Sequence, residues 1–258
     1  MRTVLFYKNM DTKLLPDEHI EYIDKEGNLP LIVSPSHTFG TDALLLADFA
    51  GVHNGRKACD FGTGCGIIPF YWLAHSAPKE IWAVEIQEKA YNQLCRSLAL
   101  AKKEDSITAL HTDLRDLKGK IPAGSLDIVT MNPPYTAVGH GIFCPDAARR
   151  TARSETEGTL DEICLAAAYL LKFGGAFCLC LRPERLTEAI YAMKNAAIEP
   201  KRLRFVHKRA TDAPWLFLLE GKRGRKPGLT VCPPLCIQDN DGSQSEEMLR
   251  ILGEYKKN

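Results

Sequence analysis

The 258-residue sequence lacks any apolar run that approaches the roughly 20 residues of a membrane-spanning helix. It also lacks the basic segment and apolar core of an N-terminal secretory signal. A strong charge imbalance is missing too, since 33 Lys and Arg residues oppose 32 Asp and Glu residues for a net charge of +1. We therefore expect a cytoplasmic protein with no membrane segment, and we exclude a generally basic nucleic-acid-binding surface.

The nine cysteines lack the paired spacing of a metal site. Neither Cys178-x-Cys180 nor the later pair, Cys232 and Cys236, comes with a second pair or with histidines at zinc spacing. Their number is odd and several lie within apolar runs, which favours buried reduced thiols over disulfides. The sequence thus predicts no metal centre and no disulfide framework.

Strand and helix patterns alternate along the middle of the chain. Strands are expected at 57–61, 81–86, 106–111, 126–131 and 176–181, and helices at 67–75, 88–102 and 159–172, the last closed by Gly174-Gly175. Two later runs, 203–207 and 215–220, favour an antiparallel pair at one sheet edge. This order predicts an α/β, Rossmann-like fold with a mostly parallel seven-stranded sheet, an antiparallel edge and helices on both faces.

No low-complexity linker or internal repeat divides the chain. Residues 1–38 are expected to form a hairpin or an irregular lead-in, packed on the domain formed by residues 39–258. The first helix of that domain is expected at 41–50, with Thr41 or Asp42 as its N-cap and an end near Gly51. A weak helical pattern at 245–255 precedes the C-terminus.

A glycine-rich loop, Asp60-Phe-Gly62-Thr-Gly64-Cys-Gly66, follows the strand expected at 57–61. Glycines let the backbone turn tightly and approach a ligand, and Glu85, at the end of the next strand, can accept hydrogen bonds from both hydroxyls of a ribose. The spacing differs from the G-x-G-x-x-G of nicotinamide-binding domains, and Asp60 would repel a pyrophosphate while favouring an amine. The loop therefore favours S-adenosylmethionine (SAM) over NAD.

Asp113 follows the strand expected at 106–111. There it could meet the adenine amine of the cofactor, or it could serve as a helix N-cap or a solvated loop residue. Both interpretations stay open.

The strand expected at 126–131 ends in Asn132-Pro133-Pro134-Tyr135. Two consecutive prolines end the hydrogen-bond ladder and fix the backbone, so the carbonyls of Asn132 and Pro133 have set directions. In a doubly wound sheet this position is adjacent to the glycine loop, where such sheets bind ligands.

An exocyclic amino nitrogen is a poor nucleophile because its lone pair is delocalised into the ring. Acceptors from the Asn132 side chain and the Pro133 carbonyl would hold its two N–H bonds and direct the lone pair toward a methyl donor. Tyr135 can stack on the planar target. Together with the glycine loop and Glu85, the motif predicts transfer of a methyl group to such a nitrogen.

With these motifs the sequence resembles the class I SAM methyltransferases that act on amino groups, and in particular the bacterial tRNA(Val) adenine-N6 methyltransferases. Beyond the motifs, the resemblance extends to segments 39–47, 152–155, 159–160, 181–186, 199–207 and 233–235. The Asn-Pro-Pro-Tyr motif alone is shared with DNA adenine, rRNA guanine and protein glutamine methyltransferases. The flanking segments are more particular, and they imply a target at adenine 37, beside the anticodon.

The resemblance also implies roles for single residues. Gly62, Gly64 and Gly66 would line the SAM pocket, Glu85 would bind the ribose of SAM, and Thr41 would close the pocket. The target base would be held by Asn132, Pro133, Pro134 and Tyr135. Ser154 departs from the pattern, because we expect a histidine between Arg153 and Glu155. Lys208-Arg209 after His207 is a second difference, and both bear on the RNA substrate rather than on the cofactor.

Basic residues gather in one late segment of this nearly neutral chain. Nine Lys and Arg residues lie between 200 and 226, at 201, 202, 204, 208, 209, 222, 223, 225 and 226, against two acidic residues. We expect Lys201, Arg202 and Arg204 to contact phosphates of tRNA, although a solvated face is the alternative. Arg149, Arg150 and Arg153 are further candidates, placed after a glycine-containing segment at 136–145 that is either a flap or a plain surface loop.

Two other functions stay open. A protein glutamine-N5 methyltransferase, or another RNA or DNA amino-methyltransferase, needs the same motif. The glutamine enzymes usually carry a separate helical N-terminal domain, for which residues 1–38 leave no room. A non-catalytic RNA-binding protein of the same fold would be expected to lose Glu85, the loop glycines or Asn132, and all are present.

Overall fold

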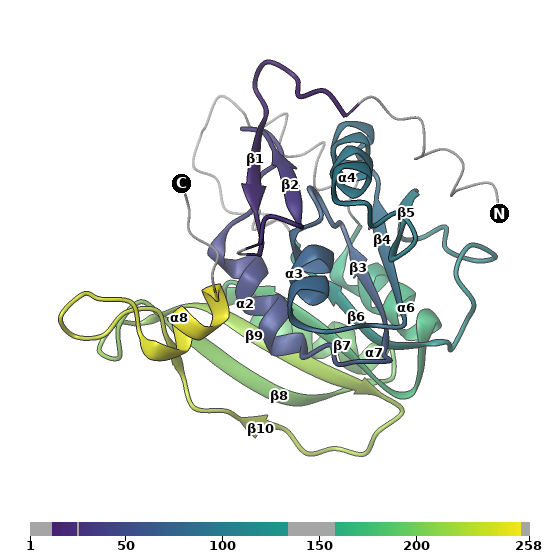
Figure 1. Ribbon diagram of the computed structural model, residues 1–258. Coiled ribbons are helices and arrows are strands. Elements are labelled where there is room, and N and C mark those ends of the chain that lie inside the picture. The colour runs from purple at the N-terminus through teal and green to yellow at the C-terminus, as the bar shows by residue number, and fades with distance from the viewer. Residues whose placement is uncertain (1–11, 25, 134–157, 254–258) are drawn as a thin grey trace, which may run out of the picture.

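The computed structural model describes residues 12–24, 26–133 and 158–253, and a large mixed sheet forms its centre (Figure 1). The strands of this sheet are β3 (Lys57–Phe61), β4 (Glu80–Glu85), β5 (Ile107–His111), β6 (Leu126–Met131), β7 (Leu171–Leu181), β8 (Ile198–His207), β9 (Pro214–Arg223), β10 (Thr230–Val231) and β11 (Leu235–Cys236). Their order is β10-β8-β9-β7-β6-β3-β4-β5, and β11 also pairs with β8. The seven strands from β3 to β9 confirm the expected Rossmann-like sheet, and two-residue strands extend its edge.

The direction of the strands divides the sheet into two parts. Strand β3 is parallel to β4 and β6, and the parallel pairing continues to β5 on one side and β7 on the other. Strand β9 is antiparallel to β7 and β8, which confirms the antiparallel pair at the edge. The carboxyl ends of all the parallel strands therefore lie along the same edge of the sheet, at right angles to the strands. The β8–β9 turn lies along that edge too.

Helices cover both faces of the sheet (Figure 1). They are α2 (Thr41–Ala50), α3 (Ile67–His75), α4 (Glu88–Ala101), α6 (Leu160–Leu170), α7 (Leu186–Asn195) and α8 (Glu246–Leu252), with a 3-10 turn at Pro183–Arg185. Successive strand residues point to opposite faces, so Ala58 joins the core beneath α2, α3 and α4, whereas Cys59 joins the core beneath α6 and α7. The same alternation separates Cys178 from Phe177.

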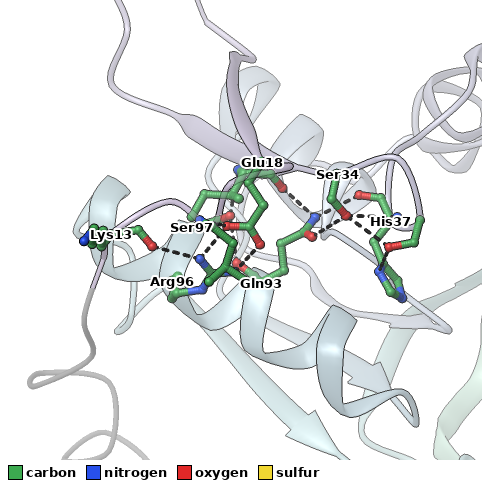
Figure 2. Close-up of polar contacts among 10 residues, drawn as sticks. Lys13, Glu18, Ser34, His37, Gln93, Arg96 and Ser97 are labelled. Atoms are coloured by element: carbon green, nitrogen blue, oxygen red, sulfur yellow. Dashed lines mark hydrogen bonds and ion pairs between the residues drawn. The ribbon is translucent and has the colours of Figure 1, made fainter.

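A separate hairpin of β1 (His19–Tyr22) and β2 (Pro30–Val33) lies beside α4 (Figure 2). The side-chain amide of Gln93 donates to the carbonyls of Ile32 and His37 at 2.7 and 2.8 Å, and Ser97 Oγ accepts from the Ile32 N–H at 2.9 Å. Arg96 adds an ion pair with Glu18. The contacts to Ile32 satisfy its N–H and C=O groups in a strand that, within the described ranges, pairs only with β1.

The start of α2 differs from the sequence prediction. Gly40 is the N-cap, with an extended backbone and no side-chain cap, whereas Thr41 is the first helical residue and is exposed. A Cβ on Gly40 would lie 2.3 Å from Asp42 Oδ1, so glycine leaves the room that the Asp42 carboxylate occupies. The helix ends at Gly51, which has a φ of 59° in the left-handed region, and this confirms the expected end.

The helix expected at 159–172 is shorter than predicted. Thr159 caps α6 through a capping box with Glu162, but the helix ends at Leu170 and β7 begins at Leu171. Gly174-Gly175 is therefore not a helix end, and the prediction was wrong on this point. A Cβ on Gly175 would lie 3.0 Å from two carbonyl oxygens, so Gly175 permits a close approach of backbone at the irregular start of β7.

The C-terminal pattern at 245–255 is confirmed as α8, which an ion pair between Arg250 and Asp48 ties to α2 at 2.8 Å. The eight cysteines of the described ranges are free thiols, and six are buried, as their apolar surroundings predicted. Within the described ranges no helix is long and apolar enough to cross a bilayer.

Candidate active site

The expected site residues meet where the central parallel strands end. The register pairs Asp60 of β3 with Ala83 of β4 and with Thr130 of β6. The glycine loop, Glu85 and Asn132 each follow or end one of these three adjacent strands. Since neighbouring strands lie about 4.8 Å apart, residues 72 positions apart in sequence, Asp60 and Asn132, lie near the same edge of the sheet.

The three glycines of the loop have different tasks. Gly62 and Gly64 both have a φ of 59°, and a Cβ on Gly64 would meet no atom within 4 Å. Gly66, with a φ of 94°, begins α3, and a Cβ there would lie 2.4 Å from Leu94 Cδ1 of α4. Gly62 and Gly64 thus leave backbone atoms accessible beside the strand ends, whereas Gly66 permits close packing of α3 against α4.

Glu85 is buried and binds the loop itself. Its Oε2 accepts from the Gly64 N–H at 2.8 Å, and its Oε1 accepts from the Gln87 N–H at 2.8 Å. Each carboxylate oxygen has lone pairs beyond those two bonds and can accept further hydrogen bonds. The carboxylate therefore fixes the glycine loop while retaining capacity for a pair of hydroxyls.

Asp60 lies beneath the loop and is only 1% exposed. Burial raises the pKa of this carboxyl to about 7, the negative charge of Glu85 adds to the increase, and the hydrogen bond from Thr130 opposes it. Thr130 Oγ1 donates to Asp60 Oδ1 at 2.7 Å. A positive group that approached the loop would favour the ionised form of Asp60.

Asn132 has polar partners at both ends of its side-chain amide. Its Nδ2 donates to Asp42 Oδ2 at 2.9 Å, and its Oδ1 accepts from the Cys180 thiol at 3.1 Å. Pro133 is buried behind it. Asp42 was not singled out from the sequence as a site residue, because the pattern placed it only in a helix start. Pro134 and Tyr135 lie outside the described residues.

Two other cofactor candidates have definite surroundings. Asp113 accepts from the Arg115 backbone N–H at 2.8 Å and pairs with its guanidinium, which lowers the pKa of Asp113. The structure thus shows Asp113 as a loop residue, and its contact with the adenine of the cofactor stays a prediction. Thr41 is exposed at the start of α2, beside Asp42.

The basic residues of segment 200–226 do not form one surface. Arg202 pairs with Glu220 at 2.7 Å and donates to the Phe49 carbonyl, and Arg204 pairs with Glu247 at 2.7 Å. Lys201 donates to the Lys226 carbonyl. Because β8 runs in the same direction as β7, its first residues lie at the edge opposite to the site. The register places Arg204 level with Cys180, and the β8–β9 turn lies beyond it at the site edge.

That turn carries Lys208 and Arg209, both exposed. Three strand spacings, or about 14 Å, separate β8 from β6 and hence from Asn132. Arg182, at the end of β7, donates to the Trp215 carbonyl, and its guanidinium lies 5.6 Å from the Trp215 ring centre. Arg149, Arg150 and Arg153 lie outside the described residues.

Comparison with known proteins agrees with this architecture. Residues 37–147 match the Methyltransferase small domain family. A tRNA1(Val) (adenine(37)-N6)-methyltransferase from Tolumonas auensis is 32% identical over 221 residues, which cover 84% of this chain and 88% of the relative. Among solved structures, a predicted O-methyltransferase from Agrobacterium tumefaciens has a TM-score of 0.67 at 19% identity, over 84% of this chain and 98% of its own. A geranyl diphosphate methyltransferase in complex with SAM has a TM-score of 0.52 at 13% identity, over 70% of this chain and 84% of its own.

The sheet order, the glycine loop after β3 and the Asn-Pro-Pro-Tyr motif after β6 define a class I SAM-dependent methyltransferase. Within that class, the chain belongs to the tRNA1(Val) (adenine(37)-N6)-methyltransferase family.

Proposed function

We propose that this enzyme transfers a methyl group from SAM to N6 of adenine 37 in tRNA1(Val). The single observation that carries the proposal is Asn132, an amide with a fixed orientation at the strand edge that also holds Glu85 and the glycine loop. The relative from Tolumonas auensis has this activity in its name. A cytoplasmic location follows from the proposed tRNA substrate.

The residues present fit SAM. No atom lies within 4 Å of the Cβ position of Gly64, so a ligand can approach this backbone closely. We assign Glu85 to the ribose hydroxyls, the backbone of Gly62 and Gly64 to the methionine part, and Asp60 to its amine. When bound, SAM supplies an electrophilic methyl group on a sulfonium.

On the target side, Asn132 Oδ1 and the Pro133 carbonyl would each accept a hydrogen bond from one N–H group of the adenine amine. These acceptors favour a pyramidal nitrogen, whose lone pair is then free to attack the methyl carbon. Transfer of the methyl group would leave one excess proton on the nitrogen, which the nitrogen would release to solvent. Positioning and fixed dipoles supply the catalysis, and no strong base is required.

For the tRNA we propose phosphate contacts by Lys208 and Arg209, which are exposed cations on the β8–β9 turn at the site edge. Arg202 and Arg204 pair with acidic side chains of the fold, so reversal of their charge would disturb stability as well as RNA binding. Roles for Arg149, Arg150, Arg153, Pro134 and Tyr135 remain predictions from the sequence.

Mass spectrometry of tRNA nucleosides tests the proposal in cells. Cells without the gene should lose N6-methyladenosine at position 37 of tRNA1(Val), and a plasmid copy should restore it. Asn132→Ala on the plasmid should fail to restore it. Unchanged methylation in cells without the gene would contradict the proposal, and a lost methyl group on guanine or on a protein glutamine would redirect it.

A further inference from the structure

A side-chain amide must be held in one orientation if it is to accept a hydrogen bond from a target amine. The two ends of an Asn amide have nearly the same shape, but one donates and the other accepts. If the Asn132 group rotated by a half turn, its NH2 would face the N–H bonds of the amine and repel them. The fixed position of the strand end does not by itself prevent such a rotation.

The structure supplies a partner that distinguishes the two ends. Asp42 Oδ2 accepts from Asn132 Nδ2 at 2.9 Å, and an ionised carboxylate has no proton to donate. In the rotated amide two oxygens would face each other, which is strongly unfavourable. On the other side the Cys180 thiol, a weak donor, donates to Asn132 Oδ1 at 3.1 Å, which favours the oxygen at that end of the amide.

The surroundings of Asp42 maintain its position. It is the second residue of α2, where the partial positive charge of the helix N-terminus favours a carboxylate. Gly40 leaves its space open, because a Cβ there would lie 2.3 Å from Asp42 Oδ1. The helix in turn packs on β6 and β7, the strands that carry Asn132 and Cys180.

We infer that Asp42 is a positioning residue for methyl transfer, which holds the Asn132 amide so that its oxygen faces the target amine. This inference rests on the proposed function, and it assigns to Asp42 no contact with SAM or with the base. Its effect should fall on the rate of transfer, since correct orientation of an acceptor matters most as the nitrogen becomes pyramidal. Gly40 contributes indirectly by leaving space for the carboxylate.

The test measures steady-state methyl transfer to unmodified tRNA together with SAM affinity. Asp42→Ala should reduce kcat by about 10- to 100-fold while SAM Kd and tRNA KM change less than about threefold. Asp42→Asn can accept from Asn132 Nδ2 or donate to its Oδ1, so it no longer distinguishes the two ends of the amide and should recover only part of the rate. Asp161→Ala is the matched control, because Asp161 is also the second residue of a helix, α6, and is exposed with a hydrogen bond from Asn195; it should keep the wild-type rate.

A double variant separates positioning from a general structural role. In Asn132→Ala, the further change Asp42→Ala should cost little, because the group it orients is absent. Multiplied losses in the double variant, an unchanged kcat in Asp42→Ala, or an Asp42→Asn enzyme as fast as the wild type would each overturn the inference. A wild-type protein that forms no N6-methyladenosine would instead overturn the proposed function.

Discussion

At the scale of single residues, Glu85 has two tasks that a simple truncation confuses. Its carboxylate holds the Gly64 and Gln87 N–H groups at 2.8 Å, and we assign the same oxygens to the ribose of SAM. Loss of cofactor affinity in a Glu85 variant is therefore expected on either account. A ligand that differs only in its ribose hydroxyls can tell the two tasks apart.

Glu85→Ala should weaken binding of S-adenosylhomocysteine by about 1–3 kcal/mol, the scale of a lost charge-assisted hydrogen bond. Calorimetry with the 2′-deoxy analogue gives the decisive comparison. Wild-type protein should prefer the ribose form, and Glu85→Ala should lose that preference. Exposed Glu88 is the control site, since Glu88→Ala should leave both affinities unchanged. If the preference persists without the Glu85 carboxylate, Glu85 serves the loop alone.

Asp60 should make stability depend on pH. Burial raises the pKa of this carboxyl to about 7 from an ordinary value of 3.8. Between these values the unfolded chain has lost the proton while the folded chain keeps it, so the free energy of unfolding falls as pH rises toward 7. Asp60→Asn should remove about 2–4 kcal/mol of this decline between pH 4 and pH 8. Denaturant unfolding of both proteins across that range measures it, and parallel pH profiles would contradict the assignment.

At the scale of elements, Gly66 belongs to the glycine loop and also determines how closely α3 packs against α4. A Cβ would lie 2.4 Å from Leu94 Cδ1, so Gly66→Ala should push α3 from α4. We expect a loss of about 2–4 kcal/mol of unfolding free energy, from overpacking and the left-handed backbone together.

Gly55 offers a matched control, because its φ of 76° is also left-handed but a Cβ there meets nothing within 4 Å. Gly55→Ala should therefore cost only the backbone part, about 1 kcal/mol. Denaturant midpoints of the two variants give the comparison. Equal losses would show that the contact with Leu94 is relieved without cost.

The sequence predicted most elements, because hydrophobic period and glycine position mark them directly. It failed where the outcome depends on partners distant in the chain. Gly174-Gly175 has the local signature of a helix end, but pairing of Leu171 with Leu126 of β6 extends the strand β7 back to Leu171. The contact between Asp42 and Asn132 joins residues 90 positions apart and has no local signature.

At the scale of the whole molecule, the basic segment 200–226 is spread along a long strand pair. A strand of ten residues spans about 33 Å, so Lys208 and Arg209 lie at the site edge, Lys222 and Arg223 lie toward the opposite edge, and Arg202 lies between them. The sequence shows their number but not their distribution, nor that Glu220 and Glu247 neutralise two of them. The motif residues Asp60, Glu85 and Asn132, by contrast, follow adjacent parallel strands, so their grouping could be predicted.

Reversal of Lys208 and Arg209 to Glu should weaken tRNA binding. The slope of the logarithm of the binding constant against the logarithm of the salt concentration should become shallower by about one to two. The control reverses Lys79 and Lys226, which are exposed at the opposite edge and change the net charge equally. Filter binding over a range of salt concentrations provides the slopes. If both double variants lose the same slope, tRNA does not dock preferentially at the site edge.

Methyl transfer from labelled SAM to unmodified tRNA1(Val), followed by nucleoside analysis, tests the central claim most directly. Wild-type protein should place the label on N6 of adenine 37. Asn132→Ala should lower kcat by about 10²–10³, the effect of removing one preorganised polar contact, with SAM affinity intact. An Asn132→Ala enzyme with full turnover, or label on any group other than an adenine amine, would contradict the account.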